Sequence, residues 1–98
     1  MKHAWRARKE AYLEHLAHAN ASTRRVSLAD KLYTRGELLA DVRREGEATW
    51  HRFAAGRADQ LWYHRSILDR MRSAGQQGRL MEAYAAIVAE LERIADDR

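Results

Sequence analysis

The sequence predicts an all-α fold of about five helices, and three observations support this prediction. The chain contains no proline, so no helix is interrupted by a residue that lacks a backbone N–H. Apolar side chains recur at three- and four-residue spacing, which is the period of an amphipathic helix. No stretch of useful length alternates between polar and apolar residues, as a half-buried strand would.

The first helix is expected at about 4–19, because its large apolar residues share one helical face. These residues are Trp5, Tyr12, Leu13 and Leu16. The segment 20–23, NAST, interrupts the pattern and supplies residues that cap helix N-termini. The second helix is expected at about 25–45, because apolar residues continue at helical spacing along this segment. This apolar stripe consists of Leu28, Leu32, Leu39 and Val42, with Ala29 alongside.

Glycines punctuate the middle of the chain. Gly36 lies inside the second helix, where glycine costs about 1 kcal/mol relative to alanine. It therefore indicates either close helix packing or space left for another group. Gly46 is well placed to stop this helix. A short third helix is expected at about 47–55, with Trp50 and Phe53 pointing inward and Gly56 after its end.

Two further helices complete the predicted fold. The fourth is expected at about 58–73, where Trp62 is placed in the core and the adjacent Tyr63 half exposed, because neighbouring residues of a helix point in different directions. The fifth is expected at about 79–96, after a glycine-containing turn at 74–78. Its apolar residues form a heptad seam that could pack on this domain or on a second copy. They are Leu80, Tyr84, Ile87, Leu91 and Ile94.

Composition limits the class of protein. Ninety-eight residues, of which 46% are hydrophobic and 33% charged, suit one small helical domain, 1–98. The net charge is +4, but arginines alternate with acidic residues, as in VRREGE, so nucleic acid is not expected as a partner. No cysteine occurs, and no apolar run approaches the roughly 20 residues that span a bilayer. The charged start, MKHAWRARKE, lacks the apolar region of a secretory signal, so a cytoplasmic location is expected.

Two places in the sequence are candidates for metal binding. His15 and His18 are three residues apart and could face one ion from a single helical turn. They lack the third ligand of a zinc site, and otherwise they are two polar positions that flank Leu16. The second candidate is Asp30, although an aspartate near the start of a helix is ordinarily a favourable partner for the helix dipole.

The stretch around Asp30, VSLADKLYTRGELLADVRREG, resembles the last motif of the HD-domain metal-dependent phosphohydrolases. It is closest to the branch of the RelA/SpoT-type alarmone hydrolases and their small relatives, where the segment reads like V-S-x-A-D-K-L-H-N-x-R-x-I-L. On one side, WRARKEAYLEHLAHA looks like the preceding helix of these proteins. On the other, WHRFAAGRADQLWYHRSIL looks like their W-x-R-F … W-Y-Y-R helices.

The resemblance implies a divalent metal, often manganese, held by a His, an adjacent His-Asp pair and a distant Asp, which activates water for attack on a phosphate group. Only the last ligand has a counterpart, Asp30, and the other three would lie upstream of residue 1. Thr34 stands where the family has an asparagine that helps to hold the nucleotide, and it lacks the carboxamide. No catalytic residue is assigned.

The chain is therefore expected to be a truncated or degenerate relative of this family that is inactive alone. Without further helices, Ala29, Leu32, Tyr33 and Gly36 would face water. We expect a homodimer or larger oligomer, or a second chain that supplies the missing half, to complete the fold. The alternative is a small helical oligomerisation or interaction module that has no catalytic role.

Overall fold

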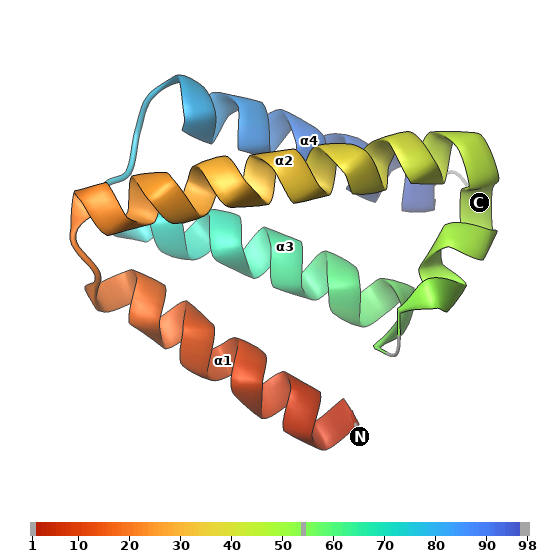
Figure 1. Ribbon diagram of the computed structural model, residues 1–98, viewed down its shortest axis with the longest axis horizontal. Helices are drawn as coiled ribbons and strands as arrows, with labels where there is room; N and C mark the ends of the chain where they lie inside the picture. The colour runs from red at the N-terminus through yellow and green to blue at the C-terminus, as the bar shows by residue number, and fades with distance from the viewer. Residues whose placement is uncertain (1, 54, 97–98) are drawn as a thin grey trace.

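The computed structural model describes residues 2–53 and 55–96 (Figure 1). Its elements, in chain order, are α1 (Lys2–His18), α2 (Ala21–Glu45), the 3-10 helix η1 (Gly46–Arg52), α3 (Gly56–Ser73) and α4 (Arg79–Asp96). No strand occurs in this part of the chain, so the all-α prediction is confirmed. The short third helix is a 3-10 helix, and apart from the start of α2 the other bounds lie within about two residues of those expected.

Local signals account for the bounds of α2. The side-chain oxygen of Asn20 accepts a hydrogen bond from the backbone N–H of Thr23 at 2.8 Å. This N-cap satisfies one of the free donors at the start of the helix, so α2 begins at Ala21, earlier than expected. Gly46 ends it with a φ of +66°, a conformation that glycine adopts without strain.

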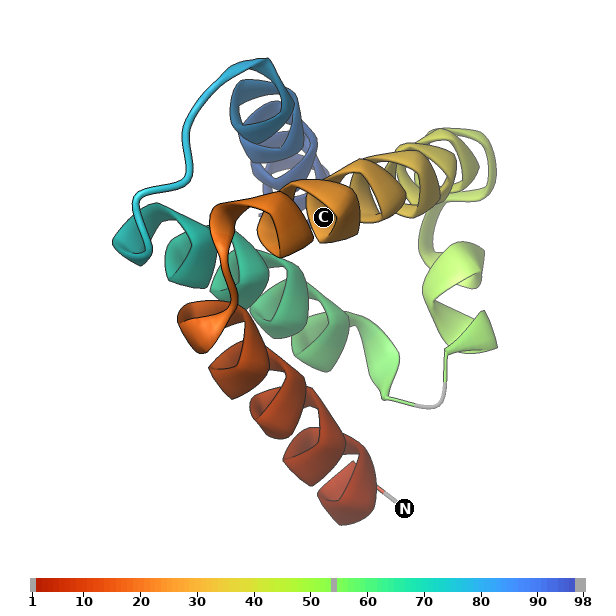
Figure 2. The same cartoon turned by 60° about the vertical axis from the view of Figure 1, so that its left-hand side comes forward.

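The helices form a flat bundle, with principal extents of 37, 31 and 19 Å. The shortest extent corresponds to about two helix diameters. α2 packs along α4 and η1, α1 packs on α3, and α3 also contacts α4. Figures 1 and 2 show α1 and α2 diverging from the turn that joins them, so the free end of α1 lies away from α2.

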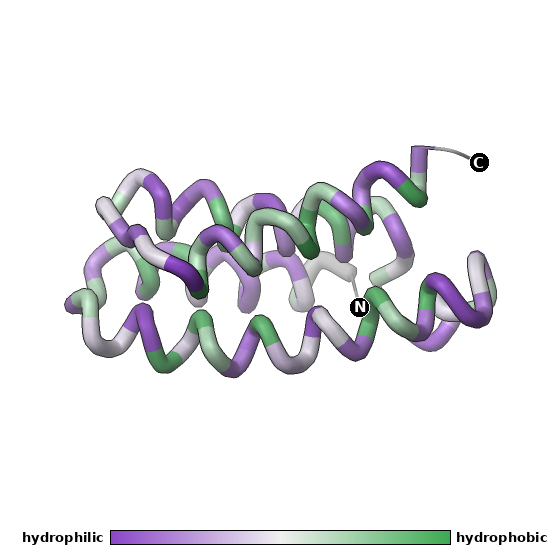
Figure 3. Tube along the Cα trace, turned by 90° about the horizontal axis from the view of Figure 1, so that it is seen from above, coloured by the Kyte–Doolittle hydropathy of each residue, from purple (hydrophilic) through white to green (hydrophobic). Residues whose placement is uncertain are grey.

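Two clusters of buried side chains form the core. The larger joins all four α-helices through Leu13, Leu16, Leu28, Tyr63, Ile67, Leu68, Met71, Met81, Tyr84 and Val88. The smaller joins the end of α2 to η1 and α4 through Leu38, Leu39, Val42, Trp50 and Leu91. The predicted seam of α4 therefore packs within this chain. Figure 3 shows polar residues between the apolar ones along each helix, and none of the described helices is long and apolar enough to cross a bilayer.

Two sequence predictions about packing are wrong in detail: the roles of Trp62 and Tyr63, and the inward position of Phe53. Tyr63 is buried, whereas Trp62 is only partly buried and carries the Arg6 guanidinium 3.5 Å from its ring centre. The buried face of α3 runs through Tyr63, Ile67 and Met71, which places Trp62 at its edge. Phe53 follows the end of η1 and is exposed. Of the two alternatives for Gly36, close helix packing is excluded and open space is found, because a Cβ there would meet no neighbouring atom within 4 Å.

Candidate functional site

Asp30 lies on the solvent side of α2. Its side chain is 69% exposed, and its nearest cation is Lys31, with 3.9 Å between Oδ2 and Nζ. Because α2 begins at Ala21, Asp30 is well beyond the first turn, where the helix dipole acts. The ordinary reading of Asp30 as a partner for the helix dipole is therefore wrong.

Thr34 lies one turn further along the same helix and is also exposed. Its hydroxyl bonds to the backbone carbonyls of Asp30 and Lys31, both at 3.3 Å, and it accepts a hydrogen bond from Nη1 of Arg35 at 3.0 Å. The hydroxyl is thus turned onto its own helix. Asp30 and Thr34 are both exposed and lie one helical turn apart on α2.

An apolar stripe runs beside Asp30. Val26 is 73% exposed and Tyr33 is 69% exposed, and Ala29 between them is exposed as well. At helical spacing these three residues fall on one line along α2. Leu32 was expected to face water, but it packs against the larger core cluster and is partly buried. We call Val26, Ala29 and Tyr33 the open face of α2.

The described residues hold no group of three or more His, Asp or Glu side chains that could bind a metal ion. The predicted pair His15 and His18 lies on the exposed side of α1. Nδ1 of His18 lies 3.1 Å from the backbone oxygen of Glu14 and 3.4 Å from its Oε2. The His18 ring therefore contacts Glu14, one turn earlier in the same helix.

Three cations, one from α1 and two from α2, lie around the rings of Tyr12 and Tyr63. Nζ of Lys9 lies 4.8 Å from the ring centre of Tyr63, and Cζ of Arg35 lies 5.8 Å from the same centre. Nζ of Lys31 lies 4.7 Å from the ring centre of Tyr12, and the two tyrosine rings are 6.4 Å apart. We call Lys9, Lys31 and Arg35 the cation cluster.

His64 lies directly beneath this cluster and is 1% exposed. Its Nδ1 accepts a hydrogen bond from Nε of Arg35 at 2.9 Å, so the proton of the neutral ring is on Nε2. No described group accepts a hydrogen bond from Nε2. Burial, together with the charges of Arg35, Lys31 and Lys9, lowers the pKa of His64 to about 2.

A hydrogen-bond network closes the other end of the bundle. Arg24 is buried, and its Nε donates to Oε1 of the buried Gln76 at 2.8 Å. Its other nitrogens donate to the backbone oxygens of Ala19 and of Ala74, the latter at 3.4 Å. One arginine of α2 therefore ties the α1–α2 turn to the α3–α4 turn.

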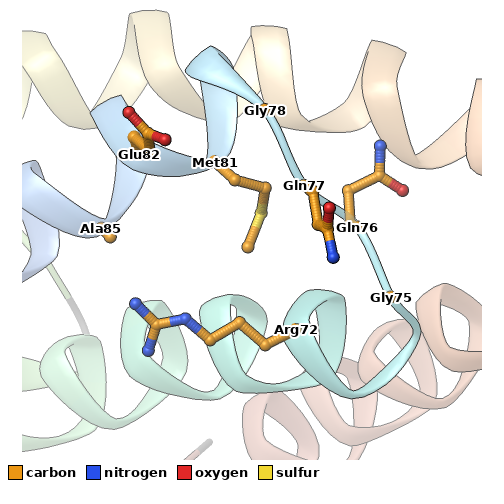
Figure 4. Close-up of a pocket in the computed structure, with 8 residues that line it drawn as sticks. All are labelled: Arg72, Gly75, Gln76, Gln77, Gly78, Met81, Glu82 and Ala85. Atoms are coloured by element: carbon orange, nitrogen blue, oxygen red, sulfur yellow. The ribbon is translucent and has the colours of Figure 1, made fainter.

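Next to this network lies a hollow of about 590 Å³ between the end of α3 and the start of α4 (Figure 4). Arg72 borders it from α3, Met81 and Glu82 border it from α4, and Gln77 borders it from the turn. One positive and one negative side chain face this hollow, so it favours neither anions nor cations.

Sequence analysis missed the cation cluster and His64. A signal was present, since Lys31 and Arg35 are four residues apart, between Leu28 and Leu38 of the buried stripe. Lysines and arginines that alternate with acidic residues indicate a solvated helix surface. Their apolar stems can nevertheless pack against aromatic rings, as those of Lys31 and Arg35 do here. The chain matches no protein-family model and no curated protein.

Proposed function

We propose that this chain is a degenerate or truncated relative of the HD-domain phosphohydrolases that is inactive alone. That family hydrolyses phosphate or pyrophosphate groups of nucleotides such as guanosine polyphosphates. The observation that carries the proposal is the position of Asp30: an exposed carboxylate in the A-D-K-L segment, beside an apolar face that stays exposed among the residues that the structure describes. Further helices on that face would bring additional metal ligands to Asp30.

The chemistry of manganese is the reason why we expect the single chain to be inactive. This ion takes about six oxygen or nitrogen ligands, and tight binding requires several of them to be held together. Asp30 is one exposed ligand, and Thr34 directs its hydroxyl to its own helix. We therefore expect millimolar affinity or weaker for the isolated chain, and no hydrolysis.

The open face of α2 also supports assembly. Complete burial of an exposed valine or of a large aromatic side chain contributes about 1.5–3 kcal/mol, and the open face offers one of each, Val26 and Tyr33. We propose that a second copy, or a chain that carries the missing ligands, covers this face. The same observation favours the second candidate function, a helical interaction module without catalysis, because that module would need the open face but not Asp30.

Two measurements test the proposal. Sedimentation at tens of micromolar is expected to give a mass above that of one chain. Val26→Asp should return the mass to one chain, whereas Ala83→Asp, at an exposed position of α4, should not. A wild-type mass equal to one chain would overturn the proposed homo-oligomer and leave only a partner of different sequence.

Calorimetric titration with manganese, repeated on Asp30→Ala, separates the two candidate functions. The isolated monomer should bind no tighter than millimolar, and micromolar binding or hydrolysis of guanosine tetraphosphate by it would contradict the proposal. In the assembled form, binding that is lost in Asp30→Ala supports descent from the phosphohydrolases. An assembly that forms but binds no manganese supports the interaction module.

A further inference from the structure

We propose that the cation cluster of Lys9, Lys31 and Arg35 is a binding site for a phosphate group, held between α1, α2 and α3. Lys31 belongs to the A-D-K-L segment, but the site would use its ammonium group and not the carboxylate of Asp30. Phosphate binding there is therefore independent of the metal chemistry of the phosphohydrolases and applies equally to an interaction module.

The cations of the cluster have little counter-charge among the described residues. Within the described residues, Lys9 and Arg35 form no ion pair, and Lys31 reaches only Asp30, at 3.9 Å. By contrast, Arg65 of α3 forms an ion pair with Glu92 of α4, with 2.6 Å between Nη2 and Oε1. The cluster therefore leaves a local excess of positive charge at the junction of three helices.

The groups that surround the cluster cannot neutralise its charge. Tyrosine rings attract cations through their faces but carry no net charge. His64 accepts a hydrogen bond from Arg35 as a neutral ring. The repulsion within the cluster is felt at Lys9, whose pKa is lowered by burial and then by the charges of Lys31 and Arg35.

The charge of the cluster favours a phosphate group over a carboxylate as its ligand. A carboxylate matches one cation, whereas a phosphate dianion has enough charge and acceptor oxygens to meet an arginine and two lysines together. The side chain of Lys31 is only 17% exposed, and Lys9 and Arg35 are also partly withdrawn from solvent. Charges in such a position are screened less than charges at the surface, so they hold an anion more firmly than scattered surface lysines do.

Inorganic phosphate is the probe for the first experiment. Amide resonances of ¹⁵N-labelled protein are followed at about pH 7.5, where most phosphate carries two charges, with sodium chloride at matched ionic strength as reference. We expect saturable shifts that centre on residues 9, 31, 35 and 64. The variant with Lys9→Gln and Lys31→Gln should bind at least tenfold more weakly.

The matched control carries Arg72→Gln and Arg79→Gln, which remove the same charge from exposed positions around the α3–α4 turn. It should bind phosphate like the wild type. Equal loss in the control, or shifts that never saturate, would overturn the proposal, since both indicate attraction by net charge alone. The amide spectrum of each variant also reports whether it is folded.

A second readout does not depend on the variants. In the wild-type protein, the pKa of the Lys9 ammonium should rise when phosphate binds, because the anion offsets Lys31 and Arg35. An unchanged pKa at saturating phosphate would contradict the site. Repeating the titration with a nucleoside monophosphate identifies the source of the phosphate: tighter binding than that of inorganic phosphate points to a phosphate ester, and weaker binding points to the free ion.

Discussion

The buried His64 should make the stability of the protein depend on pH above the range where carboxylates titrate. In the unfolded chain the imidazole pKa is 6.5, and in the folded protein it is lowered to about 2. As the pH falls below 6.5, the unfolded state takes up a proton that the folded state excludes, so stability present above that pH is progressively lost. Each pH unit corresponds to about 1.4 kcal/mol, and lowering the pH from 7.5 to 5 should therefore cost about 2 kcal/mol.

This pH interval separates His64 from the acidic groups. Ion pairs with arginine lower the pKa of Asp41, mainly through Arg44, and that of Glu90, mainly through Arg93. Stability from these carboxylates is lost only as the pH falls below their unfolded values of about 4–4.5. A loss between pH 7.5 and 5 therefore reports on histidine.

Urea denaturation across this pH range is the assay. For a slope of about 1–2 kcal/mol per molar, the wild-type midpoint should fall by about 1–2 M urea. His64→Gln keeps an amide oxygen that can accept from Arg35 but cannot titrate, so most of the pH dependence should disappear. His18→Gln, an exposed histidine of α1, is the matched control and should retain it. If His64→Gln kept the wild-type dependence, or if the folded His64 ring titrated near pH 6.5 by NMR, the reasoning would be refuted.

Other predictions test the bundle itself, each by the free energy of unfolding at neutral pH. Arg24→Met should cost about 2–3 kcal/mol, because it leaves Gln76 and two turn carbonyls without their charged donor; additivity with Gln76→Ala would show that the two side chains are not coupled. Gly36→Ala should stabilise the protein by up to about 1 kcal/mol, since the added Cβ meets only open space, and a loss would mean that something covers this position. Gly46→Ala should instead cost at least about 1 kcal/mol, because its φ is +66°. Asn20→Ala should cost about 1 kcal/mol through loss of the N-cap, and an unchanged stability would contradict the capping role.

Periodicity was sufficient to predict the fold class, and capping residues and glycines were sufficient to place most helix ends. The fifth predicted helix, 79–96, coincides with α4, where the apolar residues form one unbroken seam. α3 was harder, because its buried face includes the polar Gln60 and His64. The apolar residues alone therefore predict a buried face that is displaced by one residue. That prediction places Trp62 in the core and Tyr63 half exposed, whereas Tyr63 is buried and Trp62 is only partly buried.

The same limitation explains why the cation cluster was not foreseen. Hydropathy places every lysine and arginine outside, yet Arg24 is buried and Lys31 and Arg35 point toward the interior of the bundle. Where α2 diverges from α1, small apolar residues on α2 would not reach across. The long side chains of lysine and arginine span this gap with their apolar stems, and their charged ends lie near the tyrosine rings. The requirement to bridge diverging helices therefore places positive charge against the aromatic rings of this fold, where the described residues offer the three cations only one carboxylate, that of Asp30, at 3.9 Å from Lys31.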